Sequence, residues 1–216
     1  YTGMYHLLIH PNILQDVNGE YPMMESLKVG HTTGNRYTVF SLWDTYRNVS
    51  TLMTLLYPER QLDIIRTMLD MYRENGWLPK WELYGRETFT MEGDPSIPYI
   101  VDAWMRGLRD FDEQTAYEAM RKGATTPGEF NLLRPDANDY FSKGYVPLRE
   151  QYDNSVSHAL EYYIADFALS RFADALGKKK DAEMFYKRSL GYKHYYSKEF
   201  GTFRPILPDG TFYSPF

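Results

Sequence analysis

The feature of this sequence that most constrains its fold is a set of long segments in which apolar residues recur every three or four positions. In residues 58–76, PERQLDIIRTMLDMYRENG, the recurring residues are Leu62, Ile65, Met68, Leu69 and Tyr72. This spacing places apolar side chains on one face of an α-helix. Proline suits the first turn of a helix and glycine suits the position after its end, so Pro58 and Gly76 mark the two ends.

Other segments of this kind form pairs. The stretch before this helix, SLWDTYRNVSTLMTLLY, has Ser41 as a candidate N-cap and apolar residues on one side, so we expect a helix over residues 41–57. A second pair spans residues 94–110 and 112–124, with Asp112 as a candidate N-cap and Gly123 as a candidate stop. A third pair spans residues 155–177 and 179–201, and each of its helices is expected to end at a glycine.

These pairs predict an all-α fold of antiparallel helical hairpins, and three hairpins are about half of a closed toroid of helices. Long structureless connections rich in glycine and proline, over residues 16–37, 77–93 and 125–154, alternate with short ones. We expect the long ones to lie on one face and to form a binding surface. The tail, GTFRPILPDGTFYSPF, lacks helical spacing, and its Pro-Asp-Gly turn at 208–210 fits a small β-hairpin. No domain boundary is visible, so residues 1–216 are expected to be a single segment of one domain.

Composition disfavours several classes of partner. The 216 residues carry a formal net charge of -5, which disfavours binding to nucleic acid, and no apolar run is long enough to span a bilayer. The absence of cysteine excludes disulfides and thiolate metal sites. Aromatic residues make up 17% of the chain, a surplus that suits either a sugar-binding groove or contacts between helices. The chain begins without methionine inside an apolar pattern, so we expect it to be a piece of a longer protein.

Carboxylates beside aromatic residues are the first candidates for chemistry. Asp44 and Glu82 each follow a tryptophan, and Asp94 ends the long connection that contains Glu82. Two carboxylates that face each other can act as acid and base on a glycosidic bond. The alternative for Asp44 is an ion pair with Arg47, which lies one helical turn further on.

No metal signature is strong in this sequence, because the five histidines are scattered. His6 and His10 are four positions apart and are expected to share a helix face, but two histidines alone do not make a closed site.

The segment DVNGEY at 16–21 fits a tight hairpin turn or the polar rim of a pocket. Glu161 and Asp166 lie in an otherwise apolar helix, where we expect them to pair with Arg or Tyr of the next hairpin, although Glu161 could face the centre of the toroid. Nucleophile elbow, phosphate-loop and dinucleotide motifs are absent from the sequence.

Taken in order, several motifs resemble those of glycoside hydrolase family 92. They run from HPNILQDVNGEY through YTVFSLWDTYR, GWLPKWELYGRETFTMEGD and IPYIVDAWMRGLRDFD to SVSHALEYYIADFALSRFADALGK and FRPILPDGTF. The resemblance implies an exported, calcium-dependent exo-α-mannosidase that inverts the anomeric configuration and acts on terminal, α-1,2-linked mannose. It also implies that this chain is part of an (α/α)6 toroid whose C-terminal part, together with an N-terminal β-sandwich, lies outside it.

The resemblance assigns substrate binding to residues of the WDTYR and WEL motifs and to the end of the loop that follows: Trp43, Asp44, Arg47, Trp81, Glu82 and Asp94. The family's general acid, general base and most of its calcium ligands belong to motifs that this sequence lacks, so no catalytic residue is assigned here. If the chain acts alone, Asp44 and Glu82 are the first candidates. Pro95 stands where many relatives have histidine, which puts linkage preference in question.

The implied partners are a mannose-containing glycan and the remainder of the same enzyme, in a secreted or periplasmic location. Two alternatives stay open. The chain could belong to another (α/α)6 glycosidase, trehalase- or glucosidase-like, in which Asp44 or Glu82 performs the acid-base chemistry. It could also be a non-catalytic helical scaffold that binds glycans through its aromatic residues.

Overall fold

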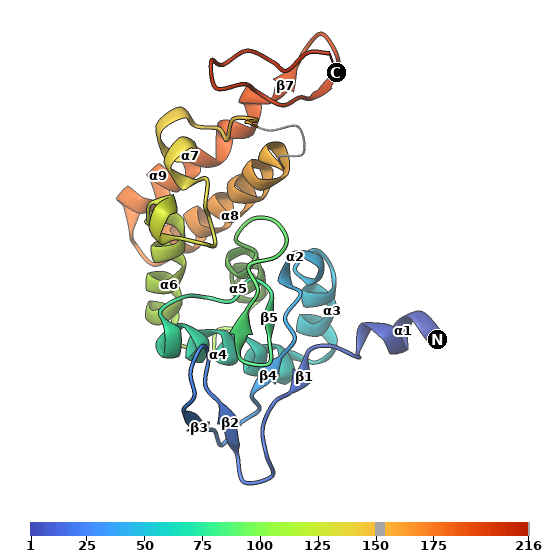
Figure 1. The fold of residues 1–216 in the computed structure, drawn as a ribbon. Coiled ribbons are helices and arrows are strands. Elements are labelled where there is room, and N and C mark those ends of the chain that lie inside the picture. Colours follow the sequence, from blue (N-terminus) through green and yellow to red (C-terminus); the bar gives the residue numbers. More distant parts are fainter. Residues whose placement is uncertain (150–153, 216) are drawn as a thin grey trace. The chain divides into compact units, whose positions relative to one another are not determined.

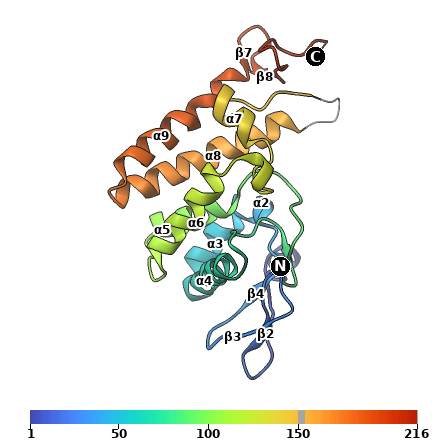
Figure 2. The same ribbon diagram turned by 60° about the vertical axis from the view of Figure 1, so that its left-hand side comes forward.

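The computed structural model describes residues 1–149 and 154–215, so residues 150–153 of the last long connection lie outside the described part (Figures 1 and 2). The chain divides into two compact units. Unit 1 is Tyr1–Met91 with Pro95–Lys122, and unit 2 is Glu92–Asp94 with Gly123–Phe216. Helices dominate both units, which confirms the predicted all-α class. Within the described residues, we find no helix with the length and apolar character needed to cross a membrane.

The helices of unit 1 are α1 (Thr2–Leu7), α2 (Leu42–Thr45), α3 (Val49–Leu56), α4 (Pro58–Asn75), α5 (Ser96–Met105) and most of α6 (Glu113–Thr125). The bounds of α4 are those predicted from its end residues. Pro58 lies in its first turn, and Gly76, which follows its last residue, adopts a left-handed φ of 85°. Ile65, Met68 and Leu69 on this helix are buried and form part of the core of the unit.

Short strands in the described part of unit 1 pair as antiparallel hairpins: β1 (Asn12–Ile13) with β4 (Tyr37–Thr38), β2 (Glu20–Pro22) with β3 (Val29–His31), and β5 (Glu82–Leu83) with β6 (Arg86–Glu87). The DVNGEY segment forms the tight turn before β2. Asp16 donates its N–H to the carbonyl of Glu20 at 2.8 Å and accepts from the N–H of Gly19 at 2.9 Å. Gly19 has a φ of 85°, a conformation that glycine adopts without strain.

Unit 2 contains α7 (Ala137–Lys143), α8 (Ser155–Ala175) and α9 (Lys179–Ser189), the 3-10 helices η1 (Gly128–Phe130) and η2 (Leu190–His194), and the paired strands β7 (Tyr196–Ser197) and β8 (Thr202–Phe203). The predicted hairpin of α8 and α9 is confirmed, and the two helices lie side by side in both views (Figures 1 and 2). In the tail, Ile206 pairs with Phe212 across the Pro-Asp-Gly turn, so the predicted small hairpin is also confirmed.

The predicted single helix over residues 41–57 is wrong, because the chain forms two short helices, α2 and α3, with a break between them. At the break, Asn48 has φ -148° and ψ -37° and stands at the N-cap of α3. Asparagine favours caps over helix interiors, since its side chain competes for backbone hydrogen bonds. Ser41 stands at the N-cap of α2, but its hydroxyl makes no hydrogen bond to the backbone of that helix.

Gly123 does not stop α6, which continues to Thr125. The glycine serves close packing instead, because a Cβ at this position would lie 2.9 Å from a carboxylate oxygen of Asp94. The other end of α6 is as predicted. Asp112 accepts a hydrogen bond from the N–H of Thr115 at 3.0 Å, the contact expected of an N-cap.

Three further predictions were wrong in their bounds. The helix expected over residues 179–201 ends at Ser189 and continues as η2, where a Cβ on Gly191 would lie 2.6 Å from the ring of Tyr163. Residues 137–143, expected to be part of a structureless connection, form α7. His10 lies outside α1, which ends at Leu7, so it does not share a helix face with His6.

Candidate functional site

The candidate site in unit 1 is formed where two segments of the chain run side by side. Residues 39–42 lead from β4 into α2, and residues 80–83 enter β5. The N–H of Phe40 donates to the carbonyl of Glu82 at 3.0 Å, and the N–H of Leu42 donates to the carbonyl of Lys80 at 3.4 Å. This pairing brings the WDTYR and WEL motifs into the same part of the unit, although they are far apart in the sequence.

The two tryptophans of these motifs share an unusual feature. Trp43 and Trp81 are partly exposed, yet each indole N–H is buried and has no hydrogen-bond partner in the described part of the chain. A buried tryptophan N–H usually finds an acceptor. Each of these two indole N–H groups therefore lacks an acceptor among the described residues.

Asp44 and Arg47 supply charge beside Trp43, and both side chains are exposed. The carboxylate of Asp44 accepts a hydrogen bond from the hydroxyl of Ser41. The guanidinium of Arg47 lies 5.2 Å from the centre of the Trp43 ring and 4.8 Å from that of Tyr46. This stacking holds a cation against an aromatic surface, an arrangement that presents both hydrogen-bond donors and a ring face to a polar ligand.

Glu82 occupies a different environment from Asp44, because its side chain is fully buried. Its carboxylate accepts hydrogen bonds from the hydroxyl of Thr38 at 2.9 Å and from the N–H groups of Val39 at 3.1 Å and Gly85 at 2.5 Å. Burial raises the pKa of Glu82 above its ordinary value, and these hydrogen bonds oppose the rise only in part. All of these partners lie within the protein.

Asp94 belongs to unit 2, where it is buried in a network of ion pairs. Its carboxylate lies 3.1 Å from Nε of Arg134, and Nη1 of the same arginine lies 2.9 Å from Asp166. Asp166 also accepts hydrogen bonds from Arg188 and, at 2.7 Å, from the hydroxyl of Tyr140. The prediction that Asp166 pairs with Arg and Tyr is confirmed, but the predicted location of the partners is wrong. Arg188 belongs to α9 of the same hairpin, and Arg134 and Tyr140 precede α8 in the chain.

Sequence reasoning missed Glu87, which lies opposite Glu82 in the β5–β6 hairpin. Its carboxylate accepts hydrogen bonds from the N–H groups of Lys80 at 2.7 Å and Trp81 at 2.9 Å. The backbone that carries Trp81 is therefore held by a side chain on the neighbouring strand. A glutamate five residues after Glu82, on the far side of a Tyr-Gly turn, is the sequence signal that could have identified this role.

The family resemblance implies a bound calcium ion with most of its ligands outside this chain, and this stays a prediction. Among residues 1–149 and 154–215, no group of three or more histidine, aspartate and glutamate side chains is placed so that it could hold a metal ion. Calcium requires six to eight oxygen ligands, so none of the described residues is assigned to such a site.

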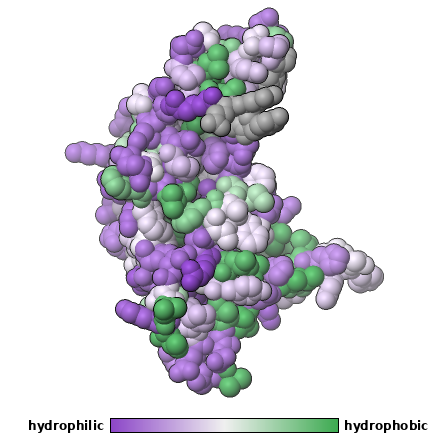
Figure 3. Space-filling model, viewed as in Figure 1, coloured by the Kyte–Doolittle hydropathy of each residue, from purple (hydrophilic) through white to green (hydrophobic). Residues whose placement is uncertain are grey.

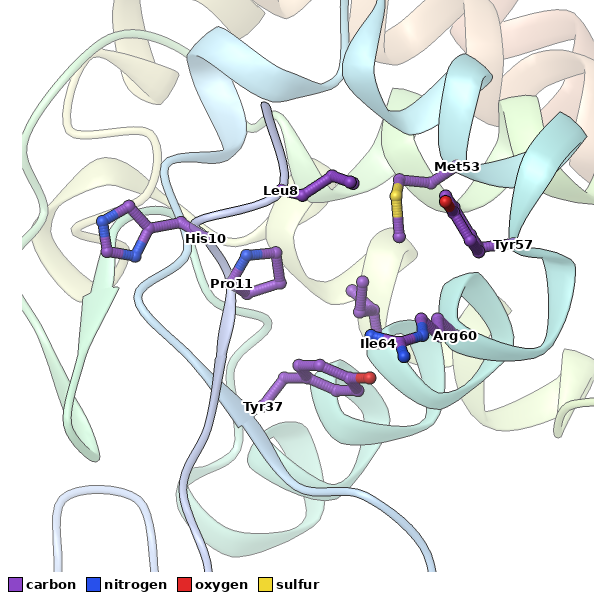
Figure 4. Close-up of a pocket in the computed structure, with 8 residues that line it drawn as sticks. All are labelled: Leu8, His10, Pro11, Tyr37, Met53, Tyr57, Arg60 and Ile64. Atoms are coloured by element: carbon purple, nitrogen blue, oxygen red, sulfur yellow. The ribbon is translucent and has the colours of Figure 1, made fainter. Parts of the chain in front are cut away.

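A separate cavity of about 150 Å³ lies in unit 1 between the segment after α1 and the start of α4 (Figure 4). It is lined by Leu8, His10, Pro11, Tyr37, Met53, Tyr57, Arg60 and Ile64. Its walls are largely apolar and contain no carboxylate. It includes none of the site residues predicted from the sequence, and we do not assign it to the candidate site.

Comparisons with known proteins relate the chain to one enzyme family. The family model described as "Glycosyl hydrolase family 92 catalytic domain" matches residues 1–216. A solved GH92 α-mannosidase from Bacteroides thetaiotaomicron, in complex with mannoimidazole, is 34% identical with a TM-score of 0.90, and the match covers 100% of this chain and 28% of that one. A solved GH92 inverting mannosidase from the same species is 30% identical with a TM-score of 0.89, covering 99% of this chain and 29% of that one.

A curated relative from Arthroderma benhamiae, described as an uncharacterized secreted glycosidase, is 28% identical over 152 residues. That match covers 65% of this chain and 19% of the relative. The chain therefore spans less than a third of the length of each of these relatives.

Proposed function

The chain belongs to glycosyl hydrolase family 92, and from this premise we propose that the full-length enzyme is an exo-acting α-mannosidase that removes terminal mannose from glycans. The predicted fold, an all-α part of an (α/α)6 toroid, is confirmed by its likeness to solved structures of the family. Two of these relatives are described as mannosidases, which supports mannose as the sugar. The observation in this chain that supports the proposal best is the pair of unpartnered indole N–H groups beside an exposed carboxylate.

In the proposed complex, Asp44 accepts hydrogen bonds from two neighbouring hydroxyls at the non-reducing end of the sugar, because a carboxylate can accept from several donors at once. The N–H groups of Trp43 and Trp81 donate to sugar oxygens, and the indole rings shape the walls of the pocket. Arg47 adds a donor from its place against Trp43. Such contacts bind only a chain end, which gives the enzyme its exo action.

Glu82 and Asp94 were also predicted to contact the sugar. Their carboxylates are buried and hydrogen-bonded to other groups of the protein. A fully satisfied buried carboxylate has little capacity left for a ligand, so we limit the proposed direct contacts to the other four residues.

We propose inversion of configuration and a preference for α-1,2 linkages as the finer description of the reaction. Inversion requires one carboxylic acid that protonates the leaving oxygen and one carboxylate that activates water on the opposite face of the sugar. We assign both groups to parts of the enzyme outside this chain, because the sequence lacks the family motifs that carry them. Pro95, in place of the histidine of many relatives, is a candidate determinant of linkage preference.

We also propose that residues 1–216 are one segment of a larger helical domain in a secreted or periplasmic enzyme. The secreted relative supports the location. Large apolar side chains come to the surface in both units. In unit 1 they include Val17, Leu27 and Val29, and hydrophobic patches are visible around β2 and β3 (Figure 3). In unit 2, α8 and α9 present Phe167 and Tyr186 on a face with a groove of about 510 Å³. Exposed apolar patches of this kind are typical of surfaces covered by another element.

The experiment that tests the function measures mannose release from α-1,2-linked mannobiose by the full-length protein. We expect hydrolysis by the wild type, a large loss in D44A, and no change in D110A, which removes an exposed aspartate elsewhere in unit 1. Faster hydrolysis of an α-glucoside or trehalose would favour another (α/α)6 glycosidase. Saturable binding of the glycan without any turnover would favour a non-catalytic scaffold.

A further inference from the structure

The segment that leads into Trp43 contains a strained residue. Val39 has a φ of 66°, in the left-handed region that is rare for residues other than glycine and an outlier for a β-branched side chain. The residue is buried and lies four positions before Trp43. The direction of the chain after Val39 decides where the WDTYR motif lies, so whatever stabilises this conformation also places the motif.

Glu82 stabilises it from the neighbouring segment. One carboxylate oxygen accepts from the N–H of Val39 at 3.1 Å, and the hydroxyl of Thr38 donates to both oxygens, at 2.9 and 3.1 Å. On the other side of Val39, the N–H of Phe40 donates to the main-chain carbonyl of Glu82 at 3.0 Å. Thr38, Val39 and Phe40 are therefore all bound to one residue.

The same carboxylate also fixes the turn of the β5–β6 hairpin. It accepts from the N–H of Gly85 at 2.5 Å, and the hydroxyl oxygen of Thr38 accepts from the N–H of Tyr84 at 2.8 Å. Tyr84 and Gly85 both have left-handed φ values, 51° and 84°. Glu82 thus joins two irregular backbone segments that come from different parts of the sequence.

Glu87 holds the backbone at the second tryptophan, Trp81. In addition to the N–H groups of Lys80 and Trp81, its carboxylate accepts from the N–H of Phe89 at 2.8 Å, and Phe89 has a φ of 54°. Glu82 and Glu87 face each other in the register of the hairpin. Two glutamates that lie opposite each other in the hairpin therefore hold the two backbone segments that lead to Trp43 and Trp81.

We propose that Glu82 is a positioning residue that acts through Val39 to place Trp43 and Asp44, with Glu87 placing Trp81, and that neither carboxylate touches the sugar. The inference rests on the proposed function for the identity of the ligand. The placement of the tryptophans by the two glutamates stands on the hydrogen bonds alone.

The different hydrogen-bonding groups of glutamate and glutamine allow a direct test of the role of Glu82. Glutamine has the shape of glutamate but replaces one acceptor oxygen with a donor NH₂ group. In E82Q, that group would face the donor N–H of Val39 or that of Gly85, so one of the bonds that join the two irregular segments is lost. Glycine adopts a positive φ without strain, so V39G removes the need for the bond. If Glu82 acts through Val39, V39G will rescue E82Q.

The experiment compares four full-length proteins: the wild type, E82Q, V39G and the E82Q/V39G double variant. One readout is kcat and KM for mannobiose. The other is the ¹⁹F NMR resonance of Trp43 in protein labelled with 5-fluorotryptophan, assigned with W43F. We expect E82Q to shift this resonance and to lower kcat/KM by up to about 100-fold, the effect of a misplaced binding group, and we expect the double variant to recover most of both relative to V39G. E59Q, at an exposed glutamate in the first turn of α4, is the matched control and should change neither.

The outcomes separate the two proposals. Loss of activity in E82Q with an unchanged Trp43 resonance, or a loss that V39G does not relieve, would overturn the positioning role. If the wild type hydrolyses no mannoside, the proposed function fails, and the resonance alone still decides whether Glu82 places Trp43. If E82Q does not fold, T38V is the alternative variant, because it removes only the hydroxyl that donates to Glu82. It should shift the Trp43 resonance in a way that V39G reverses.

Discussion

Arg134 and Asp166 form an ion pair 2.9 Å long in which both side chains are 0% exposed. A second guanidinium, that of Arg188, also binds Asp166, and Asp94 binds Arg134. Removing one member of such a network leaves a buried charge without its counter-ion, which typically costs about 3–5 kcal/mol. We expect D166N to lower the free energy of unfolding by this amount in urea titrations. D174N, on the same helix but in an exposed ion pair with Lys179, is the control and should have a much smaller effect.

The same pair predicts a dependence of stability on pH. Burial alone would raise the pKa of Asp166, but the charges of Arg188 and Arg134 outweigh burial and hold the pKa below its ordinary value of 3.8. The folded state therefore binds this proton more weakly than the unfolded state. The stabilisation is fully present above pH 3.8 and is lost as the pH falls through the lower, folded-state pKa.

We therefore expect the difference in unfolding free energy between wild type and D166N to be constant near neutral pH and to shrink below pH 3.8. Denaturant titrations of both proteins over this range measure it. A difference that grows toward acid would contradict the assignment, because it would require the folded state to bind the proton more tightly.

Local signals in the sequence predicted the features that local interactions decide. Pro58 and Gly76 bound α4 because the end of a helix depends on the residues at that end. Gly123 gave the same signal as Gly76 but lies inside α6, where it makes room for Asp94. A glycine that ends a helix and a glycine that allows close packing cannot be distinguished from their neighbours in sequence, because the packing partner comes from another segment.

In the candidate site, too, the sequence predicted some features and could not predict those that depend on distant segments. Motifs located Trp43, Asp44 and Trp81, and the structure brings their two segments together. That Glu82 is buried could not be predicted, because its partners Thr38 and Val39 lie 44 and 43 positions away in the chain. Nothing in a WEL motif distinguishes a glutamate that faces solvent from one that supports a neighbouring segment.

Gly123 gives a prediction that opposes the usual effect of its substitution. Glycine to alanine inside a helix normally stabilises by about 0.5–1 kcal/mol. In G123A, however, the new Cβ would lie 2.9 Å from Asp94 and would disturb its ion pair with Arg134, so we expect a net loss of stability. Thermal unfolding measures the change. G3A is the control, because no atom lies within 4 Å of a Cβ at Gly3 in α1, and it should not destabilise the protein.

The unpartnered N–H of Trp43 gives the most direct test of the sugar pocket. Phenylalanine keeps an aromatic surface but removes the N–H, so W43F should lose one hydrogen bond to the sugar, which is worth about 0.5–1.5 kcal/mol. We therefore expect kcat/KM for mannobiose to fall by roughly 2- to 12-fold, with little change in stability because the N–H has no partner within the described protein. W77F is the matched control, since Trp77 is also a partly exposed tryptophan of unit 1 but stacks with Lys122, and it should leave kcat/KM unchanged. Equal losses in the two variants would mean that the effect comes from packing, and the N–H of Trp43 would no longer be assigned to the sugar.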